Sequence, residues 1–167
     1  MATSNKSARI TGMLFGAYAI SQAYIATLLR PLGRDVLRLQ TTADPDELRR
    51  IMAAWTPEQR AQYRKHLLPD TLHPLLYSSA LIAAGLVGHR ASTPRCVRVA
   101  AVAAPALSAG CDLVENGFHA AFITRPDRIS QGAARASTLF TRTKWLLALG
   151  TAGTLLGRVL HKRRTRS

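Results

Sequence analysis

The chain has 167 residues, of which 47% are hydrophobic, and its formal net charge is +14. This length leaves room for one domain, and we expect residues 1–167 to form a single membrane domain. So large a positive charge is typical of nucleic-acid-binding proteins when the chain is soluble. Here the basic residues flank long apolar runs, where they would meet anionic lipid headgroups. We therefore expect membrane lipids, and no nucleic acid, as partners.

Four apolar runs dominate the chain, and each is long enough to cross the ~30 Å hydrocarbon core of a bilayer. The first contains no charged residue and is interpreted as a retained anchor rather than a cleaved leader. The other three contain a few polar or charged residues, so a soluble helical bundle is the competing interpretation. The scarcity of charge favours the membrane, and the expected fold is all-α, a four-helix transmembrane bundle. The runs cover about residues 10–29, 69–88, 97–123 and 136–160.

The connector between the first two runs is the only long one, and residues 43–67 are predicted to form amphipathic surface helices. Asp44-Pro45 is a fair helix start, with acidic residues near the positive end of the helix. Thr56 gives a stronger start, because a Thr N-cap, Pro57 at N1 and Gln59 at N3 form a capping box. This second helix would lead directly into the second apolar run.

Four spans place both termini on the same side of the membrane. The loop around Arg90 and the basic tail that follows His161 favour the cytoplasm for that side. We therefore expect a multi-pass protein of the cell (inner) membrane with both termini in the cytoplasm.

Polar residues recur at helical spacing within the last three runs. Within each run they are three or four positions apart, so they share one helix face. An isolated charge in lipid is costly, and we therefore expect these side chains to face inward and pair. The set comprises Asp70, His73 and Tyr77 in the second run, Asp112, Glu115, Asn116 and His119 in the third, and Thr141 and Lys144 in the fourth.

Lys144 is predicted to pair with Asp112 or Glu115. A single buried Asn or His often only holds helices together, and a lysine can extend to the membrane surface. Two carboxylates one turn apart, with a lysine facing them, are more typical of a functional site. The chain contains no HExxH, paired CxxC, GxGxxG or P-loop pattern, so neither a metal nor a cofactor is expected.

Several of these residues fall into three short motifs: Asp70-x-x-x-Pro74-x-x-Tyr77, Asp112-Leu-Val-Glu115-Asn116 and Thr141-Arg-Thr-Lys144-Trp145. Together they resemble a family of uncharacterised bacterial four-helix integral membrane proteins with a D-x-x-E-N motif in the third span. The resemblance covers nearly the whole chain. It implies the four-span fold and a common site, and it implies no activity.

The first functional hypothesis is a cofactor-free intramembrane enzyme that isomerises or cyclises a lipophilic small molecule such as an isoprenoid. Carboxyl groups in a low-dielectric chamber keep their protons closer to neutral pH and can deliver them there. The expected catalytic residues are Asp112, Glu115, Asn116, Lys144 and Asp70, and the expected substrate-binding residues are His73, Tyr77, His119, Thr141 and Trp145.

Two alternatives stay open. One is a proton-coupled carrier or exporter, in which the lysine–carboxylate pair acts as the switch. Four helices would then need a second copy to enclose a pathway, so a homodimer is an option. The other is a non-catalytic accessory subunit of a larger membrane complex.

Overall fold

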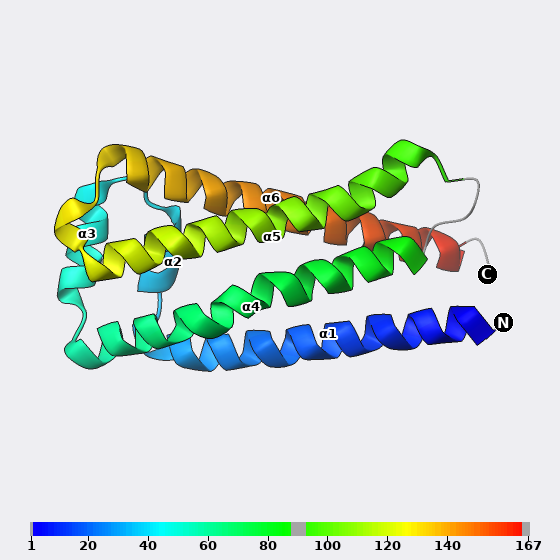
Figure 1. Ribbon diagram of the computed structural model, residues 1–167, viewed down its shortest axis with the longest axis horizontal. Coiled ribbons are helices and arrows are strands. Elements are labelled where there is room, and N and C mark those ends of the chain that lie inside the picture. Colours follow the sequence, from blue (N-terminus) through cyan, green and yellow to red (C-terminus); the bar gives the residue numbers. More distant parts are fainter. Residues whose placement is uncertain (1, 88–92, 165–167) are drawn as a thin grey trace.

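The computed structural model describes residues 2–87 and 93–164, and within them every regular element is a helix. This confirms the predicted all-α fold. The long helices run antiparallel to their chain neighbours, and the short ones gather at the end of the bundle opposite the termini (Figure 1). The elements are α1 (Ala2–Leu29), η1 (Arg30–Leu32), α2 (Asp35–Thr41), α3 (Pro45–Ala54), α4 (Pro57–Val87), α5 (Arg95–Thr124), η2 (Pro126–Arg128) and α6 (Gln131–Arg164).

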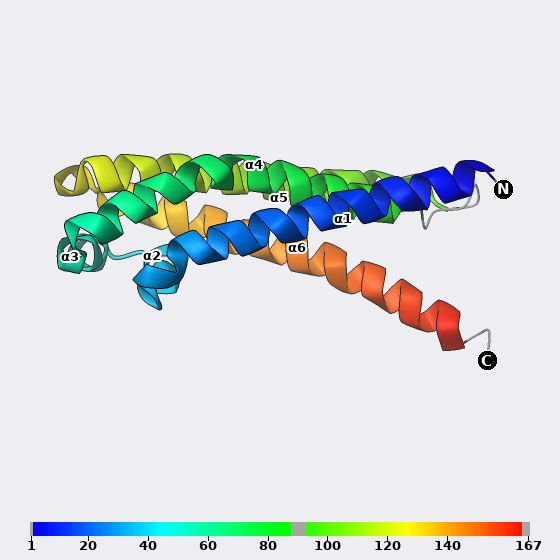
Figure 2. The same cartoon turned by 90° about the horizontal axis from the view of Figure 1, so that it is seen from below.

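The long helices form a curved row rather than a closed ring. α1 packs on α4, α4 packs on α5, and α5 packs on α6, whereas α6 contacts α4 only sparsely. Toward its C-terminal end α6 diverges from the other three helices (Figure 2). The bundle is thus most open between α6 and its neighbours near the termini.

Two of the helices are long and apolar enough to cross a membrane. The qualifying stretches are Asn5–Leu32, which includes most of α1, and Arg95–Thr124, which is α5. The other two long helices of the described chain do not meet the same criterion of length and hydropathy. Charged residues interrupt their apolar runs, among them Asp70 in α4 and Lys144 in α6.

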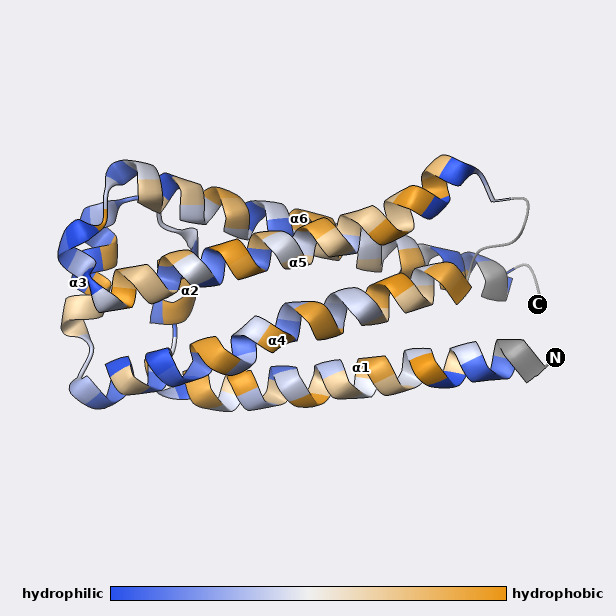
Figure 3. Cartoon of the chain, viewed as in Figure 1, coloured by the Kyte–Doolittle hydropathy of each residue, from blue (hydrophilic) through white to orange (hydrophobic). Residues whose placement is uncertain are grey.

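The long helices place large apolar side chains outside and polar side chains inside. On α6, Leu146 is 75% exposed, whereas Lys144, two residues earlier, is only 7% exposed. On α4, Leu72 is 60% exposed beside the buried His73. A water-soluble protein shows the opposite arrangement. Figure 3 shows that hydrophilic residues gather around α3 and the start of α4, while apolar residues dominate much of α1.

A conventional hydrophobic core fills only the end of the bundle that carries α2 and α3. There the short helices fold over the ends of α4, α5 and α6, and we call this part the cap. The Trp55 indole nitrogen donates a hydrogen bond to the Asp35 carboxylate at 3.1 Å. The buried residues of the cap are Leu32, Leu39, Leu48, Ile51, Met52, Trp55, Tyr63, Phe122, Ile123, Ile129 and Ala134.

Both predicted helix starts in the connector are present. Asp44 caps α3 by accepting a hydrogen bond from the Asp46 amide at 2.9 Å. At the start of α4, the Gln59 amide donates to Thr56 Oγ1 at 3.2 Å, and the Thr56 amide donates to Gln59 Oε1 at 2.9 Å. These reciprocal bonds are the predicted capping box.

The boundary that we predicted between connector and second run is absent from the structure. α4 continues from Pro57 to Val87 without a break, so residues 57–67 are its first turns rather than a separate surface helix. The remainder of the connector is helical, as predicted, and its apolar residues are buried in the cap. Residue 88, the loop around Arg90 and the last three residues of the basic tail lie outside the described residues.

Candidate functional site

A buried ion cluster joins α5 to α6 near the middle of the bundle. Lys144 Nζ donates a hydrogen bond to Asp112 Oδ1 at 2.8 Å and lies 2.8 Å from Glu115 Oε2. Asp112 is 5% exposed and Glu115 is completely buried. The predicted contact is therefore present, and Lys144 is shared between both carboxylates rather than paired with one.

The cluster contains hydrogen-bonding capacity that the described protein atoms do not use. Apart from the ion pair with Lys144, neither Glu115 oxygen has a hydrogen-bond partner, and His119 Nε2 has none. His119 is one helical turn beyond Glu115 on the same face of α5. Buried polar atoms are nearly always satisfied in folded proteins. Two such groups side by side therefore mark a place where a small polar group would be stabilised.

Tyr63 supports the cluster from the cap. Its hydroxyl lies 3.0 Å from His119 Nδ1, which fixes the orientation of the imidazole ring. His66, on the same helix as Tyr63, has its Nε2 3.9 Å from Asp70 Oδ2. Our sequence analysis missed both residues.

The signal for these residues was present in the sequence. Residues 63, 66, 70, 73 and 77 continue one helical stripe at spacings of three or four. The predicted run begins at residue 69, so residues 63 and 66 were left out of the stripe.

Pro74 explains why Asn116 faces α4. Proline has no backbone N–H, so the carbonyl of Asp70, four residues earlier, loses its helical hydrogen bond. The Asn116 side-chain amide donates to this carbonyl at 2.9 Å. Asn116 therefore joins α5 to α4 and satisfies an acceptor that the proline leaves open.

Further polar contacts link all four long helices at the level of the cluster. On α4, His73 Nδ1 lies 3.1 Å from Ser21 Oγ of α1, and the Tyr77 hydroxyl lies 3.0 Å from Ser108 Oγ of α5. Ser108 Oγ in turn donates to the Lys144 carbonyl of α6 at 2.8 Å. Ser108 is fully buried and was not among the predicted site residues.

Two predicted substrate-binding residues lie at the margin of the cluster. Thr141 is buried, and its hydroxyl donates to the Ser137 carbonyl of its own helix at 3.1 Å. Trp145 is 50% exposed on the outer side of α6, with its ring centroid 5.8 Å from Lys144 Nζ. No group of three or more His, Cys, Asp or Glu side chains in the described chain is placed to hold a metal ion.

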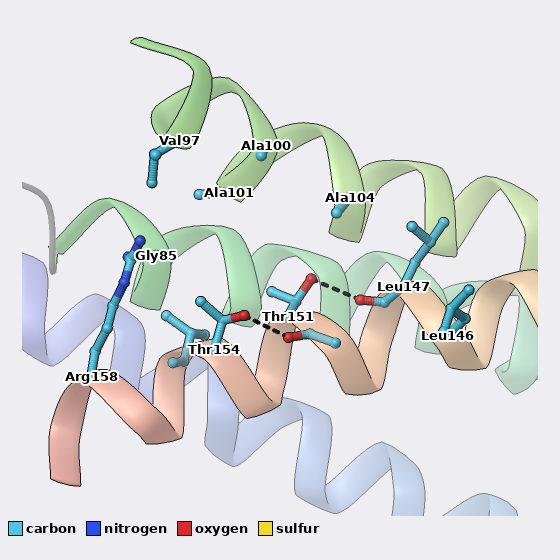
Figure 4. Close-up of a pocket in the computed structure, with 12 residues that line it drawn as sticks. Gly85, Val97, Ala100, Ala101, Ala104, Leu146, Leu147, Thr151, Thr154 and Arg158 are labelled. Carbon is cyan, nitrogen blue, oxygen red and sulfur yellow. Dashed lines mark hydrogen bonds between the residues drawn. The ribbon is translucent and has the colours of Figure 1, made fainter. Parts of the chain in front are cut away.

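A crevice of about 250 Å³ opens between α5 and α6 beside the cluster (Figure 4). Ala104 on α5 is one turn from Ser108, and Leu147 on α6 is one turn from Lys144, so the crevice ends next to the ion cluster. Its walls are small or apolar, and Arg158 extends toward Gly85 at the other end (Figure 4). Thr151 and Thr154 also line it, but both hydroxyls bond to carbonyls of their own helix.

Comparison of the chain with family models, curated proteins and solved structures yields no match.

Proposed function

We propose that this chain is a four-span membrane protein whose buried Asp112–Glu115–Lys144 cluster performs acid–base chemistry on a lipophilic small molecule. The observation that carries the proposal is one lysine held by two buried carboxylates, beside Glu115 Oε1 and His119 Nε2, which lack hydrogen-bond partners. Buried ionisable groups of this kind inside a membrane are functional by default. Membership in the bacterial D-x-x-E-N family and an inner-membrane location are part of the same proposal.

The outward apolar faces of α4 and α6 support their assignment as spans. Both helices exceed the ~20 residues that a bilayer crossing needs, with 31 residues in α4 and 34 in α6. Their exposed surfaces carry leucines such as Leu72 and Leu149, whereas their charged residues Asp70 and Lys144 face the interior. Water would leave the leucines exposed, but lipid would cover them.

Cysteine labelling tests this topology. In a background in which Cys96 and Cys111 are replaced by serine, single cysteines are introduced at exposed positions 5, 41, 95, 127 and 161. Four spans predict that an impermeant thiol reagent reaches 5, 95 and 161 from one side and 41 and 127 from the other. If only α1 and α5 cross, position 95 labels with 41 and position 127 labels with 5. That result would refute the four-span arrangement.

The cluster can carry out a balanced proton exchange without a cofactor. Two carboxylates share one ammonium, so the site can hold one further proton on Glu115. The Glu115 O–H would donate that proton to a carbon–carbon double bond, and loss of a proton from a neighbouring carbon to Asp112 or Glu115 would give the isomer. Attack by a second double bond in the same molecule would instead close a ring and move the positive charge to a new carbon, and loss of a proton from its neighbour to Asp112 or Glu115 would give the neutral cyclic product. Lys144 keeps the carboxylates in place and limits their repulsion.

The crevice between α5 and α6 provides the route for such a substrate. Its walls are apolar, it ends one turn from Lys144, and it lies where α6 diverges from its neighbours (Figure 2). In this proposal His119, Tyr77 and Thr141 contact the substrate beyond the inner end of the crevice, around the ion cluster, and Trp145 lies outside it. Asn116 and His73 act as positioning residues, because Asn116 joins α5 to the Asp70 carbonyl of α4 and His73 joins α4 to α1.

Lipid profiling tests the proposed activity. Lipophilic extracts are compared by mass spectrometry between cells that lack the chain and cells that express wild type, Asp112→Asn or Glu58→Gln. Glu58 is an exposed acid outside both pockets, so Glu58→Gln, which also replaces a carboxylate by an amide, is the control. We expect Asp112→Asn to accumulate the same compound as the null cells, and purified wild type to convert it without added cofactor. Normal extracts from Asp112→Asn cells would disprove the chemistry.

Proton-coupled transport is the second candidate, and one observation favours it. Polar pairs lie on both sides of the ion cluster, Tyr63 with His119 toward the cap and Tyr77 with Ser108 toward the crevice. Water molecules that joined these pairs to the cluster could pass protons between the two ends. Vesicles containing the purified chain and a pH-sensitive dye would show proton entry under a membrane potential, and the loss of that entry in Asp112→Asn would favour transport over catalysis.

A further inference from the structure

The cap contains a second pocket, which lies apart from the buried ion cluster. Its lining contains more charged residues than that of the crevice between α5 and α6. It has a volume of about 460 Å³ and lies between α3, the start of α4 and the end of α5. Met52 and Ile123, both buried, contribute to its lining. Its charged lining residues are Arg49, Arg60, Arg64 and Asp127.

The guanidinium groups of this pocket are held by main-chain carbonyls. Arg60 Nη2 donates to the Ala53 carbonyl at 3.3 Å, and Arg64 Nη2 donates to the Ile123 carbonyl at 3.4 Å. Arg49 donates from Nε to the Pro126 carbonyl at 3.3 Å and from Nη2 to the Ile129 carbonyl at 2.6 Å. Cations near the last carbonyls of a helix are stabilising, so these contacts explain why the side chains converge without requiring a ligand.

The contacts leave most of the binding capacity of two arginines unused. A guanidinium has five N–H donors, and Arg60 and Arg64 each use one of them with described protein atoms. Both are exposed and lie one turn apart on α4, so their free donors face the same space. Asp127 is the only acid in the lining, and it forms no ion pair with a described residue. Arg49 is already paired with the Asp46 carboxylate beside the pocket, so Arg60 and Arg64 supply the two positive charges that are not committed to an acid.

We infer that this pocket binds a terminal phosphate group with two or more negative charges, either a phosphomonoester or a diphosphate. The two uncommitted guanidinium groups match such a charge, and the planar fork of each matches two phosphate oxygens. The group can be free in solution or carried by a lipid, since the proposed topology puts the pocket at the membrane surface. This site does not depend on the proposed chemistry of the buried cluster, and its test leaves that cluster unaltered.

Binding is measured with the purified full-length chain in two arms. One arm titrates inorganic phosphate and pyrophosphate in neutral detergent. The other uses phosphatidylcholine vesicles that contain phosphatidic acid or, as the lipid control, the same fraction of phosphatidylserine. We expect the Arg60→Gln/Arg64→Gln variant to bind about 100-fold more weakly, roughly tenfold for each charged hydrogen-bonding partner lost. The matched control Arg34→Gln/Arg135→Gln removes two exposed arginines outside the pocket and should stay within about twofold of wild type.

A third variant separates binding from folding. Asp127→Asn removes a negative charge without removing any arginine–carbonyl contact, and it should bind phosphate more tightly than wild type. Binding in both arms indicates a site for phosphate from either source, and binding in one arm assigns the source. Equal affinity for phosphatidic acid and phosphatidylserine, together with no response to pyrophosphate, would overturn the inference. Equal losses in the pocket variant and in the matched control would overturn it too, because binding would then be diffuse.

Discussion

Lys144→Met is expected to lower the free energy of unfolding by about 3–5 kcal/mol, the usual cost of leaving one partner of a buried ion pair alone. Lys144 is the common partner of Asp112 and Glu115, so its removal leaves two buried carboxylates without a cation. One of them would take up a proton, which limits the damage and lets the chain fold. Unfolding in mixed detergent micelles measures the change. Arg142→Met is the matched control, because Arg142 lies on the same helix but is exposed.

A second substitution added to Lys144→Met distinguishes an effect on stability from an effect on activity. Combining Lys144→Met with Glu115→Gln or with Asp112→Asn removes one of the unpaired carboxylates, and one of the two combinations should recover stability. Neither should recover activity, because the proton-transferring group or its partner is still missing. The double-mutant cycle gives the coupling energy of each pair directly. If both single variants and the doubles keep wild-type stability and phenotype, the cluster only packs the helices together.

Leu48→Ala is expected to cost about 2–5 kcal/mol, because it opens a cavity in the hydrophobic core of the cap. Leu48 is 1% exposed. Leu72→Ala makes the same chemical change on the outer side of α4, where the side chain is 60% exposed, and it should cost less than about 0.5 kcal/mol. Trp55 reports unfolding of the cap by fluorescence in a Trp145→Phe background, since these are the only two tryptophans.

The comparison between the two leucines tests the arrangement of polarity in the bundle. Lipid or detergent replaces the contacts that Leu72 loses, whereas nothing replaces those of Leu48. An equally large cost for Leu72→Ala would mean that this face is covered by protein, as in a homodimer.

The spacing of residues along the sequence was sufficient to predict two kinds of contact. One is the hydrogen bonding at the start of a helix, and the other is the pairing of charged residues that share a helix face. The capping box of Thr56 and Gln59 depends on four consecutive residues. The contact of Lys144 with Asp112 and Glu115 follows from helical spacing and from the cost of unpaired charge in an apolar environment. Both features are encoded locally, or by a single physical requirement, and the structure contains both.

Features that depend on how the helices are rotated against one another were not predictable. Trp145 adjoins Lys144 in sequence, but the helix turns it outward. Tyr63 reaches His119 only because α4 continues through Pro69 and Pro74, whereas prolines usually interrupt helices. The two buried residues Met52 and Ile123 meet in the cap although they are far apart in the chain. No local pattern specifies such packing.

The position of the ion cluster has a consequence for how the chain enters the bilayer, given the four-span proposal. α5 carries Asp112 and Glu115, and α6 carries Lys144. A charged residue at the centre of a lone inserting helix costs roughly 2.5–3.5 kcal/mol on the scale measured for the translocation machinery. These charges therefore lower the tendency of each helix to insert alone. The short link of residues 125–130 lets α5 and α6 enter together as a helical hairpin, with the opposite charges neutralised during biogenesis rather than after it.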